Sequence, residues 1–295
     1  MATETALDLI NRQEWLDPLS DSVQSAVHKT YEAAGEAGRQ AKNAMHGVWL
    51  GHPLHPVLTD IPLGAWATAL ACDAMEEITG RKEFGQAADI AVGIGLVGAV
   101  GAAITGLTDF SDTDGQARKI GMMHGLMNIA GTGLYTASLA CRKNGNRATG
   151  RGLSLLGFLV AAGSAWLGGS LVYSEQVGVN HAAGGAPLPS DWVTVMEEAD
   201  LKPGELRRVD AGGYPVLLVK RADKICAIGE RCSHAGGPLS EGKLEGYTIT
   251  CPWHGSRFNL ETGEVLDGPA THPEPCFEVR VHGGQIEVRN RPGQA

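Results

Sequence analysis

Two short segments in the C-terminal third of the chain carry residues that bind metals. The first is Cys232-Ser-His234; after sixteen intervening residues comes Cys251-Pro-Trp-His254. Two thiolates and two imidazoles suit a tetrahedral zinc ion, or a [2Fe–2S] centre with one iron on two Cys and the other on two His. Each segment supplies one donor of each kind, so two loops that close on each other place the thiolates together and the imidazoles outward. One residue between Cys and His is awkward for chelating a single ion, so the pattern favours two irons and leaves zinc as the alternative.

Short β-type runs surround both segments and must hold them in place. The runs cover residues 216–219, 225–228, 247–250, 277–281 and 286–288. Turns rich in glycine and proline separate them, as is typical of antiparallel strands. Residues 186–295 are therefore predicted to form a small all-β domain.

This region, roughly residues 190–291, resembles the Rieske ferredoxin-like domain family. The resemblance rests on Cys232-Ser-His234-Ala-Gly-Gly-Pro238-Leu239, Cys251-Pro-Trp-His254-Gly-Ser-Arg-Phe258, Thr262-Gly263 and Gly268-Pro269-Ala270. It implies a β-sandwich with a [2Fe–2S] cluster at its tip. It also implies that Cys232 and Cys251 bind the inner iron, and that His234 and His254 bind the outer iron near the surface, where electrons leave.

The sequence departs from the respiratory branch of that family in two ways that affect the reduction potential of the cluster. That branch carries an extra Cys in each cluster loop, where this chain has Gly237 and Trp253. It also places a Ser and a Tyr after the second His; here Ser256 is present, but Phe258 has no hydroxyl. Fewer hydrogen bonds to cluster sulfur favour the oxidised state, which predicts a potential near the low end of the Rieske range, on the order of −150 mV. A ferredoxin or an oxygenase-associated carrier fits this better than a quinol oxidase.

A ring-hydroxylating oxygenase would need a further iron held by two His and a carboxylate. Only 41 residues follow His254, and they contain just His272 and His282. No oxygenase active site is therefore expected within this sequence.

Upstream, the chain has long stretches without charge. Residues 90–108, 120–141 and 152–174 contain no Asp, Glu, Lys or Arg, and each has about the 20 residues that a helix needs to cross a bilayer. A weaker fourth span is predicted near 54–76, because residues 45–72 hold a single charge, Asp60. Small residues recur every four positions, as at Gly98, Ala102 and Gly106, which lets helices pack closely in lipid. The prediction is a multi-domain protein, with an all-α four-helix transmembrane bundle at 45–185 before the small all-β Rieske-type sandwich.

Residues 46–180 resemble a bacterial membrane-domain family of unknown function. The matching stretches are Gly51-His52-Pro53-Leu54-His55-Pro56 with Pro62, Gly106-Leu107-Thr108-Asp109, and Trp166-Leu167-Gly168-Gly169-Ser170-Leu171-Val172-Tyr173. The resemblance implies four helices and supplies no activity.

Ionisable residues of the predicted bundle cluster on one face. With four antiparallel spans, the face that carries the Rieske domain also carries His52, His55, Asp60, Asp109 and His124. Such residues at membrane depth suggest a functional site. Three interpretations stay open: a haem b ligated by His52 or His55 with His124; a pocket for a quinone, a small ligand or a single metal; or polar groups that satisfy backbone freed by nearby prolines.

Charge and composition limit the partners and the location. The chain has 33 acidic and 24 basic residues, a net charge of −9, which disfavours nucleic-acid binding. Residues 1–44 look helical and amphipathic, and show no signal peptide. The loop charges weakly place the Rieske domain outside, whereas the lack of a twin-arginine motif and the unpaired cysteines favour the cytoplasmic face of the inner membrane.

The sequence thus predicts a membrane-anchored electron-transfer protein that carries one electron on a low-potential cluster. Its expected partners are membrane lipid and a redox protein, either a reductase, an oxygenase or a ferredoxin acceptor; a homo-oligomer is left open. Two alternatives remain: a quinone- or haem-linked membrane oxidoreductase in which the bundle exchanges electrons with the cluster, and a redox sensor.

Overall fold

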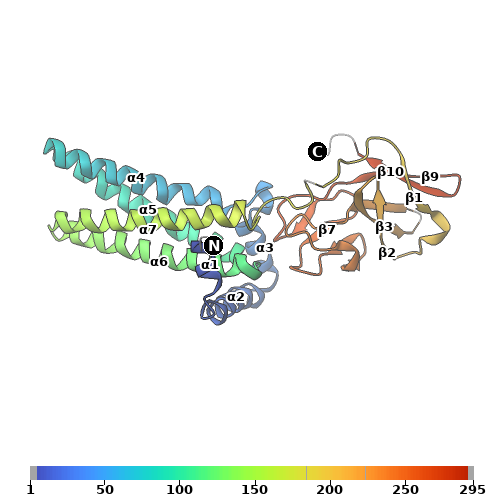
Figure 1. Cartoon of the computed structure of the whole chain (residues 1–295), viewed down its shortest axis with the longest axis horizontal. Coiled ribbons are helices and arrows are strands. Elements are labelled where there is room, and N and C mark those ends of the chain that lie inside the picture. Colours follow the sequence, from blue (N-terminus) through green and yellow to red (C-terminus); the bar gives the residue numbers. More distant parts are fainter. Residues whose placement is uncertain (1–4, 184, 223, 292–295) are drawn as a thin grey trace. The chain divides into compact units, whose positions relative to one another are not determined.

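The computed structural model describes residues 5–183, 185–222 and 224–291, and the chain divides into two compact units. One unit is helical and comprises residues 1–38 and 54–177; the other is mainly β-structure and comprises residues 39–53 and 178–295 (Figure 1). Residues 45–53 and 178–183, at the two ends of the predicted 45–185 domain, group with the β unit. There the His181 N–H donates to the Ser233 carbonyl at 2.9 Å, and His46 is buried against Gly268.

Four long helices dominate the described part of the helical unit. They are α4 (His55–Thr79), α5 (Lys82–Phe110), α6 (Gly115–Lys143) and α7 (Arg147–Tyr173). α4 packs along α5, and α6 packs along α7, as two antiparallel hairpins. The first hairpin turns at Gly80, a left-handed C-cap with φ 68°, a conformation that glycine adopts without strain. These helices lie where the uncharged stretches predicted them.

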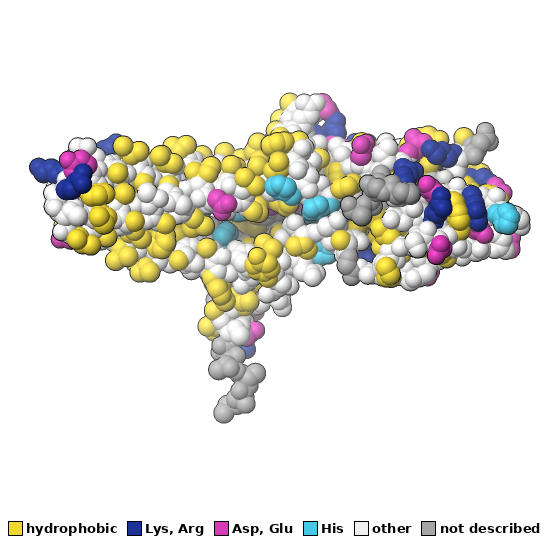
Figure 2. Space-filling view, turned by 90° about the horizontal axis from the view of Figure 1, so that it is seen from above, with side chains coloured by type: hydrophobic (Ala, Val, Ile, Leu, Met, Phe, Trp, Pro, Cys, Tyr) yellow, Lys and Arg dark blue, Asp and Glu magenta, His cyan; other side chains and the backbone are white. Residues whose placement is uncertain are grey.

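The surface of these helices is apolar. Among the described helices, α5 and α7 are long and apolar enough to cross a membrane. Large hydrophobic side chains such as Val97, Leu159 and Trp166 are exposed on them. Figure 2 shows hydrophobic side chains over much of the helical part and charged ones gathered at its left end. The fold confirms the four helices, while two of them meet the criteria for a span.

The two hairpins are an internal repeat, which the sequence interpretation missed. The first helix of each hairpin, α4 or α6, has identical or similar residues at positions 69 apart. The pairs are His55/His124, Gly64/Gly133, Trp66/Tyr135, Leu70/Leu139, Ala71/Ala140 and Cys72/Cys141. The second helices match at positions 62 apart, and the pairs are Gly95/Gly157, Ala99/Ala161, Gly101/Gly163, Ala103/Ala165 and Gly106/Gly168. Equivalent positions thus recur in each hairpin.

Equivalent residues of α4 and α6 meet each other across the centre of the bundle. The rings of Trp66 and Tyr135 stack with centroids 4.1 Å apart. Seven residues further along each helix, Arg142 forms a buried ion pair with Asp73. His55 and His124 form a third pair, with ring centroids 6.4 Å apart. These three layers relate the hairpins by an approximate two-fold axis along the helices.

Shorter helices precede the hairpins. They are α1 (Ala6–Asn11), α2 (Leu16–Ala33) and α3 (Gly35–His46), followed by the 3₁₀ turn η1 (Val48–Leu50). α2 packs on the connection between α5 and α6, where the Gln24 side chain donates to the carbonyls of Phe110 and Thr113, both at 2.8 Å. This contact ties α2 to carbonyls at and just beyond the end of α5.

The β unit consists of antiparallel sheets in its described residues. The first sheet has the order β1-β10-β9, the second β2-β3-β4 and the third β5-β6-β7-β8. The strands are β1 (Val193–Glu197), β2 (Leu206–Ala211), β3 (Tyr214–Arg221), β4 (Lys224–Gly229), β5 (Lys243–Glu245), β6 (Thr248–Thr250), β7 (Arg257–Asn259), β8 (Val265–Asp267), β9 (Phe277–His282) and β10 (Gln285–Asn290). β3 is buried from both sides because alternate residues enter two apolar clusters, Leu217 and Val219 on one side and Val216 and Leu218 on the other. Four of the five predicted runs lie within strands, and the run 247–250 overlaps β6 except at Tyr247, a turn residue.

Candidate metal centre

The first metal-binding segment forms a loop that follows β4. In this loop the N–H of Cys232 donates to the carbonyl of Gly237 at 2.8 Å, and the N–H of Gly236 donates to the carbonyl of Cys232 at 2.8 Å. Gly236 has φ 78°, which side chains rarely adopt. The two bonds fold the loop back on itself around His234.

The second segment, between β6 and β7, repeats this pattern. The N–H of Cys251 donates to the carbonyl of Ser256 at 2.8 Å, and the N–H of Gly255 donates to the carbonyl of Cys251 at 3.2 Å. Gly255 also has φ 78°. In both loops the Cys bonds to the fifth residue after it and accepts from the fourth, so the two loops have the same backbone scaffold.

The two thiols lie together beneath the loops. Cys232 is 1% exposed and Cys251 4% exposed. A side-chain hydrogen bond between them raises the pKa of Cys232 and lowers that of Cys251 to about 7. Backbone N–H groups of His234, Trp253 and His254 also donate to these sulfurs. Such donors stabilise a thiolate and tune any metal that it binds.

The two imidazoles are half-buried, unlike the buried thiols. The ring centroids of His234 and His254 are 5.0 Å apart, with the ring planes at 86°. The structure therefore has the arrangement expected from the sequence, with thiols paired inside and imidazoles paired toward the surface.

The first loop leaves no room for a side chain at Gly237. A Cβ on Gly237 would lie 2.9 Å from the Cys251 sulfur and 3.0 Å from the Trp253 ring. In the described ranges, no group of three or more His, Cys, Asp or Glu residues lies close enough to hold one metal ion. Two sulfur and two nitrogen donors, each kind in its own pair, are the donor set of a Rieske-type centre.

A third loop supports the second one, and Asp267 beside it, with its partners on α3, was missed by the sequence interpretation. The N–H of Ala270 donates to Oγ of Ser256 at 3.0 Å. Just before this loop, Asp267 is buried and accepts from Arg257 and from Asn43, both at 2.8 Å, and it pairs with Arg39. α3 is thereby fastened to the edge of the site. Partners more than 200 positions apart in the sequence leave no local pattern.

Glu274 is a second residue that the sequence did not single out. It is 2% exposed, and it accepts the N–H of Ser233, which lies between the ligands of the first loop, at 2.6 Å. Burial raises its pKa well above the ordinary value for a carboxyl. The Ser233 hydroxyl donates to the carbonyl of His272 at 2.6 Å. Glu274 and His272 thus fix the backbone between Cys232 and His234.

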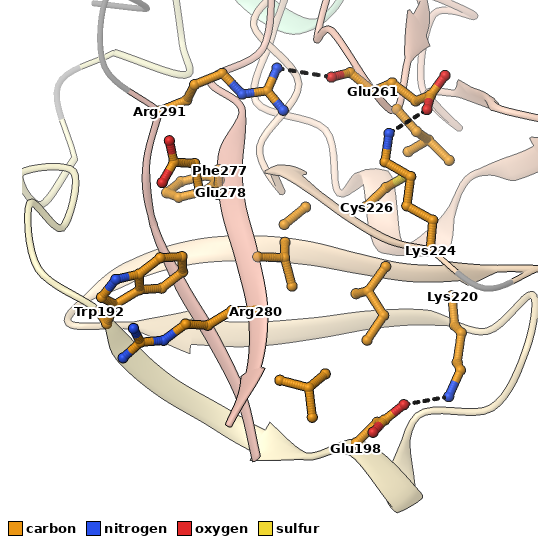
Figure 3. A pocket seen from close by; sticks show the side chains of 15 residues that line it. Trp192, Glu198, Lys220, Lys224, Cys226, Glu261, Phe277, Glu278, Arg280 and Arg291 are labelled. Atoms are coloured by element: carbon orange, nitrogen blue, oxygen red, sulfur yellow. Dashed lines mark hydrogen bonds and ion pairs between the residues drawn. The ribbon is translucent and has the colours of Figure 1, made fainter. Parts of the chain in front are cut away.

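A separate groove of about 500 Å³ lies along the first half of β4 and the facing strand β9. Its charges are paired: Lys220 with Glu198 at 3.0 Å and Lys224 with Glu261 at 2.5 Å, and Arg291 donates to the Glu261 carbonyl (Figure 3). The groove contains none of the predicted metal ligands.

The predicted membrane site is only partly assembled. His55 and His124 meet inside the bundle. Asp60 is exposed on α4, and Asp109 is half-buried near the end of α5. His52, the remaining residue of the predicted site, groups with the β unit and is exposed, with Nδ1 3.1 Å from the Pro53 carbonyl; its place at the site stays a prediction.

Two protein families match the chain. The Rieske [2Fe-2S] domain matches residues 191–280. The family described as Predicted membrane protein (DUF2231) matches residues 51–181. The two matches agree with the two resemblances found from the sequence.

Similar proteins match the C-terminal third. Ferredoxin CarAc of Metapseudomonas resinovorans is 39% identical over 98 residues, 33% of this chain and 92% of that protein. The 3-phenylpropionate/cinnamic acid dioxygenase ferredoxin subunit of Escherichia coli (strain K12) is 42% identical over 92 residues, 30% of this chain and 85% of that protein. Apoptosis-inducing factor 3 of Mus musculus is 38% identical over 105 residues, 35% of this chain; the match spans 17% of that protein's length.

Proposed function

Because the chain belongs to the Rieske [2Fe-2S] domain family and carries a DUF2231 membrane-protein domain before it, we propose that it is a membrane-anchored electron carrier. Its β unit is a Rieske ferredoxin that holds a [2Fe–2S] cluster. The finer parts of the proposal are the ligands, the anchor, the side of the membrane and the partner.

The ligands are the four residues of the two matched loops. Cys232 and Cys251 hold the inner iron, and His234 and His254 hold the outer iron. When bound, the cluster takes up and releases one electron. The protein's own contribution is to bury the thiols, to supply backbone N–H donors to their sulfurs, and to keep the imidazoles near the surface where a partner can approach.

The repeated hydrogen-bond scaffold of the two loops is the observation that carries this proposal. Each loop presents one Cys and one His from the same backbone turn, with its glycine at φ 78°. Two equal loops bring like donors together in pairs, as a cluster with two different irons requires.

The potential is expected on the order of −150 mV, at the low end for Rieske centres. Phe258 is fully buried and offers no hydroxyl to the cluster. Gly237 and Trp253 stand where the respiratory branch has its extra pair of cysteines, and a Cβ on Gly237 would lie 3.0 Å from the Trp253 ring. A carrier of this kind donates to an oxygenase more readily than it accepts from a quinol.

The apolar outer surface of α5 and α7 supports the anchor. Their hydrophobic side chains point away from the bundle. Contact with water costs such side chains free energy, and contact with lipid removes that cost. The described cysteines are free thiols, which suits a reducing compartment and supports the cytoplasmic face for the β unit.

The partner class follows from the relatives, one of which is named as a dioxygenase ferredoxin subunit. We propose a terminal oxygenase as acceptor and a flavin reductase as donor. The test uses the full chain purified in detergent and mixed with an NADH-dependent ferredoxin reductase. One electron per chain should enter the cluster, followed by transfer to an aromatic-ring oxygenase. If the reductase reduces the cluster but no oxygenase reoxidises it, the proposal of an oxygenase acceptor is wrong. If alkaline carbonate releases the protein from membranes, the proposal of a membrane anchor is wrong.

A further inference from the structure

The His55–His124 pair lies on the approximate two-fold axis of the helical unit. These residues occupy equivalent positions of α4 and α6, and their ring centroids are 6.4 Å apart with the planes at 89°. The other pairs on the axis, Trp66 with Tyr135 and Asp73 with Arg142, already satisfy each other by stacking and by an ion pair. Two imidazoles at this separation do not hydrogen-bond directly, so the pair needs a different account.

The hydrogen bonds of the two rings fix the same tautomer in both. Nδ1 of His55 lies 2.9 Å from the carbonyl oxygen of Ala102 on α5. Nδ1 of His124 lies 2.8 Å from the carbonyl oxygen of Ser164 on α7. A carbonyl oxygen only accepts, so each Nδ1 must carry the hydrogen, and each Nε2 keeps its lone pair. Ala102 and Ser164 are themselves equivalent positions of the repeat, 62 residues apart.

Glycines make room for the two rings. A Cβ on Gly106 would lie 2.7 Å from Cε1 of His55, and a Cβ on Gly168 would lie 3.3 Å from Cε1 of His124. The same Cβ on Gly106 would lie 2.9 Å from Nδ1 and 3.3 Å from Nε2 of His55, and the Cβ on Gly168 would lie 3.7 Å from Nδ1 of His124. Each ring therefore turns its Cε1 edge toward the second helix of its own hairpin, with Nδ1 at the carbonyl oxygen and Nε2 on the other side of Cε1.

This is the arrangement that metal-binding histidines have in proteins. A ligating His donates its other N–H to a carbonyl or carboxylate, which fixes the ring and makes the ligating nitrogen more basic. With about 2.0–2.1 Å from metal to nitrogen, two imidazoles on opposite sides of a metal have centres about 6 Å apart, close to the separation observed.

From these contacts we infer that His55 and His124 are the two protein ligands of a metal centre inside the bundle. The chemistry is that of a metal that takes neutral imidazole nitrogen, copper or iron. The iron would be that of a haem, which brings nitrogens of its own, and the copper would be a bare ion. The site goes beyond the proposed function, since the Rieske loops neither form it nor depend on it.

Asn128, one turn along α6, donates to Nε2 of His124 at 3.0 Å. The bond agrees with a lone pair on that nitrogen. It also means that the Asn128 amide competes with the metal for Nε2. The amide must turn aside when the metal binds. Replacement by leucine should therefore strengthen metal binding.

The test compares the full chain in detergent with the double variant His55→Asn/His124→Asn. An asparagine amide can still donate to the Ala102 and Ser164 carbonyls, but it has no counterpart of Nε2. Haem is measured from the Soret band and the pyridine haemochrome of protein reconstituted with hemin, and copper from anaerobic titration with Cu(I) against a competing chelator. The wild type should bind one equivalent of one of them. The metal affinity of the double variant should fall by more than the roughly 10- to 100-fold that loss of a supporting hydrogen-bond partner costs.

A haem spectrum lost in the double variant supports the haem form, and Cu(I) binding lost without any haem supports the bare ion. Equal binding by wild type and double variant, or binding of neither probe by the wild type, overturns the inference. His52→Asn is the matched control, because His52 is exposed and lies outside the pair; it should bind as the wild type does. Asn128→Leu should bind several-fold more tightly. The EPR signal of the reduced [2Fe–2S] cluster should stay unchanged throughout, which separates this result from failure of the proposed carrier function.

Discussion

Both units of the protein build a site from two copies of one supporting structure, but the copies differ in scale. In the β unit the copies are loops of a few residues, and each holds its Cys and His within four positions, as in Cys251-Pro-Trp-His254. In the helical unit the copies are whole hairpins, and each supplies one histidine, His55 or His124, 69 positions apart. The first site is a short motif in the sequence, whereas the second is a pair of distant residues related by the repeat of the hairpins.

The difference shows what a local signal can report. A cluster loop needs a tight backbone turn, so its glycine and its ligands must be close in sequence. A pair across a helical bundle needs only that two helices place equal positions opposite each other. Its residues are recognised by their contacts, such as the stacking of Trp66 on Tyr135.

The largest effect is expected from breaking one cluster loop. Cys251→Ser removes a thiolate ligand from the inner iron, so the reduced protein should lose its rhombic EPR signal and its two irons per chain. Cys226→Ser is the control, because Cys226 is a buried thiol of the same core that lies outside both loops. Iron analysis and EPR on the purified full chain measure both. A variant with wild-type iron and signal would refute the ligand assignment.

Breaking the pairing of the hairpins should act on stability and leave the cluster intact. Arg142→Met leaves Asp73 buried without its partner, and loss of one member of a buried pair costs about 3–5 kcal/mol. The double change Asp73→Leu/Arg142→Met should recover most of that loss. Unfolding of the detergent-solubilised chain by SDS, followed by circular dichroism, measures both. Equal stability of the single and double variants would contradict the prediction.

Two glycines of one helix give a smaller and sharper test of the repeat. A Cβ on Gly95 would lie 2.2 Å from the Trp66 ring, whereas a Cβ on Gly93 meets nothing within 4 Å. Gly95→Ala should destabilise by about 1–3 kcal/mol through overpacking, while Gly93→Ala should stabilise the helix by up to about 1 kcal/mol. At the equivalent position of the second hairpin the nearest Tyr135 atom is 3.0 Å away, so Gly157→Ala should cost less than Gly95→Ala. The same SDS titration ranks the three variants, and any other order would argue against this packing.

The smallest expected effect concerns the carboxyl behind the first cluster loop. Burial raises the pKa of Glu274, so the native state favours its protonated form. The protonated carboxyl contributes fully to stability below the pKa that Glu274 has in the unfolded chain. That contribution is lost as the pH rises through the raised pKa of Glu274 in the folded chain. Glu274→Gln should thus become more stable relative to the wild type as the pH rises from 5 to 8. Thermal unfolding of the full chain at both values measures the change, with the exposed Glu241→Gln as control; a difference independent of pH would contradict it.

The sequence predicted much of the fold and of the cluster site. The uncharged stretches predicted α4 to α7, because lipid and bundle cores both exclude charge. The Cys/His spacing predicted the four candidate ligands, because each loop is closed by bonds within six residues. Asp267 with Asn43, and Glu274 with Ser233, could not be predicted, since their partners are 41 or more positions away and buried polar pairs follow no period.

The sequence by itself determined which residues can bind metal in the loops and which segments avoid charge. These properties depend on side-chain chemistry and on bonds between near neighbours. The tertiary structure alone decided that α3 is fastened at Asp267, and that the rings of His55 and His124 meet on an approximate two-fold axis. Those facts depend on how distant segments pack, and packing is set by the shapes of both surfaces together rather than by either stretch of chain.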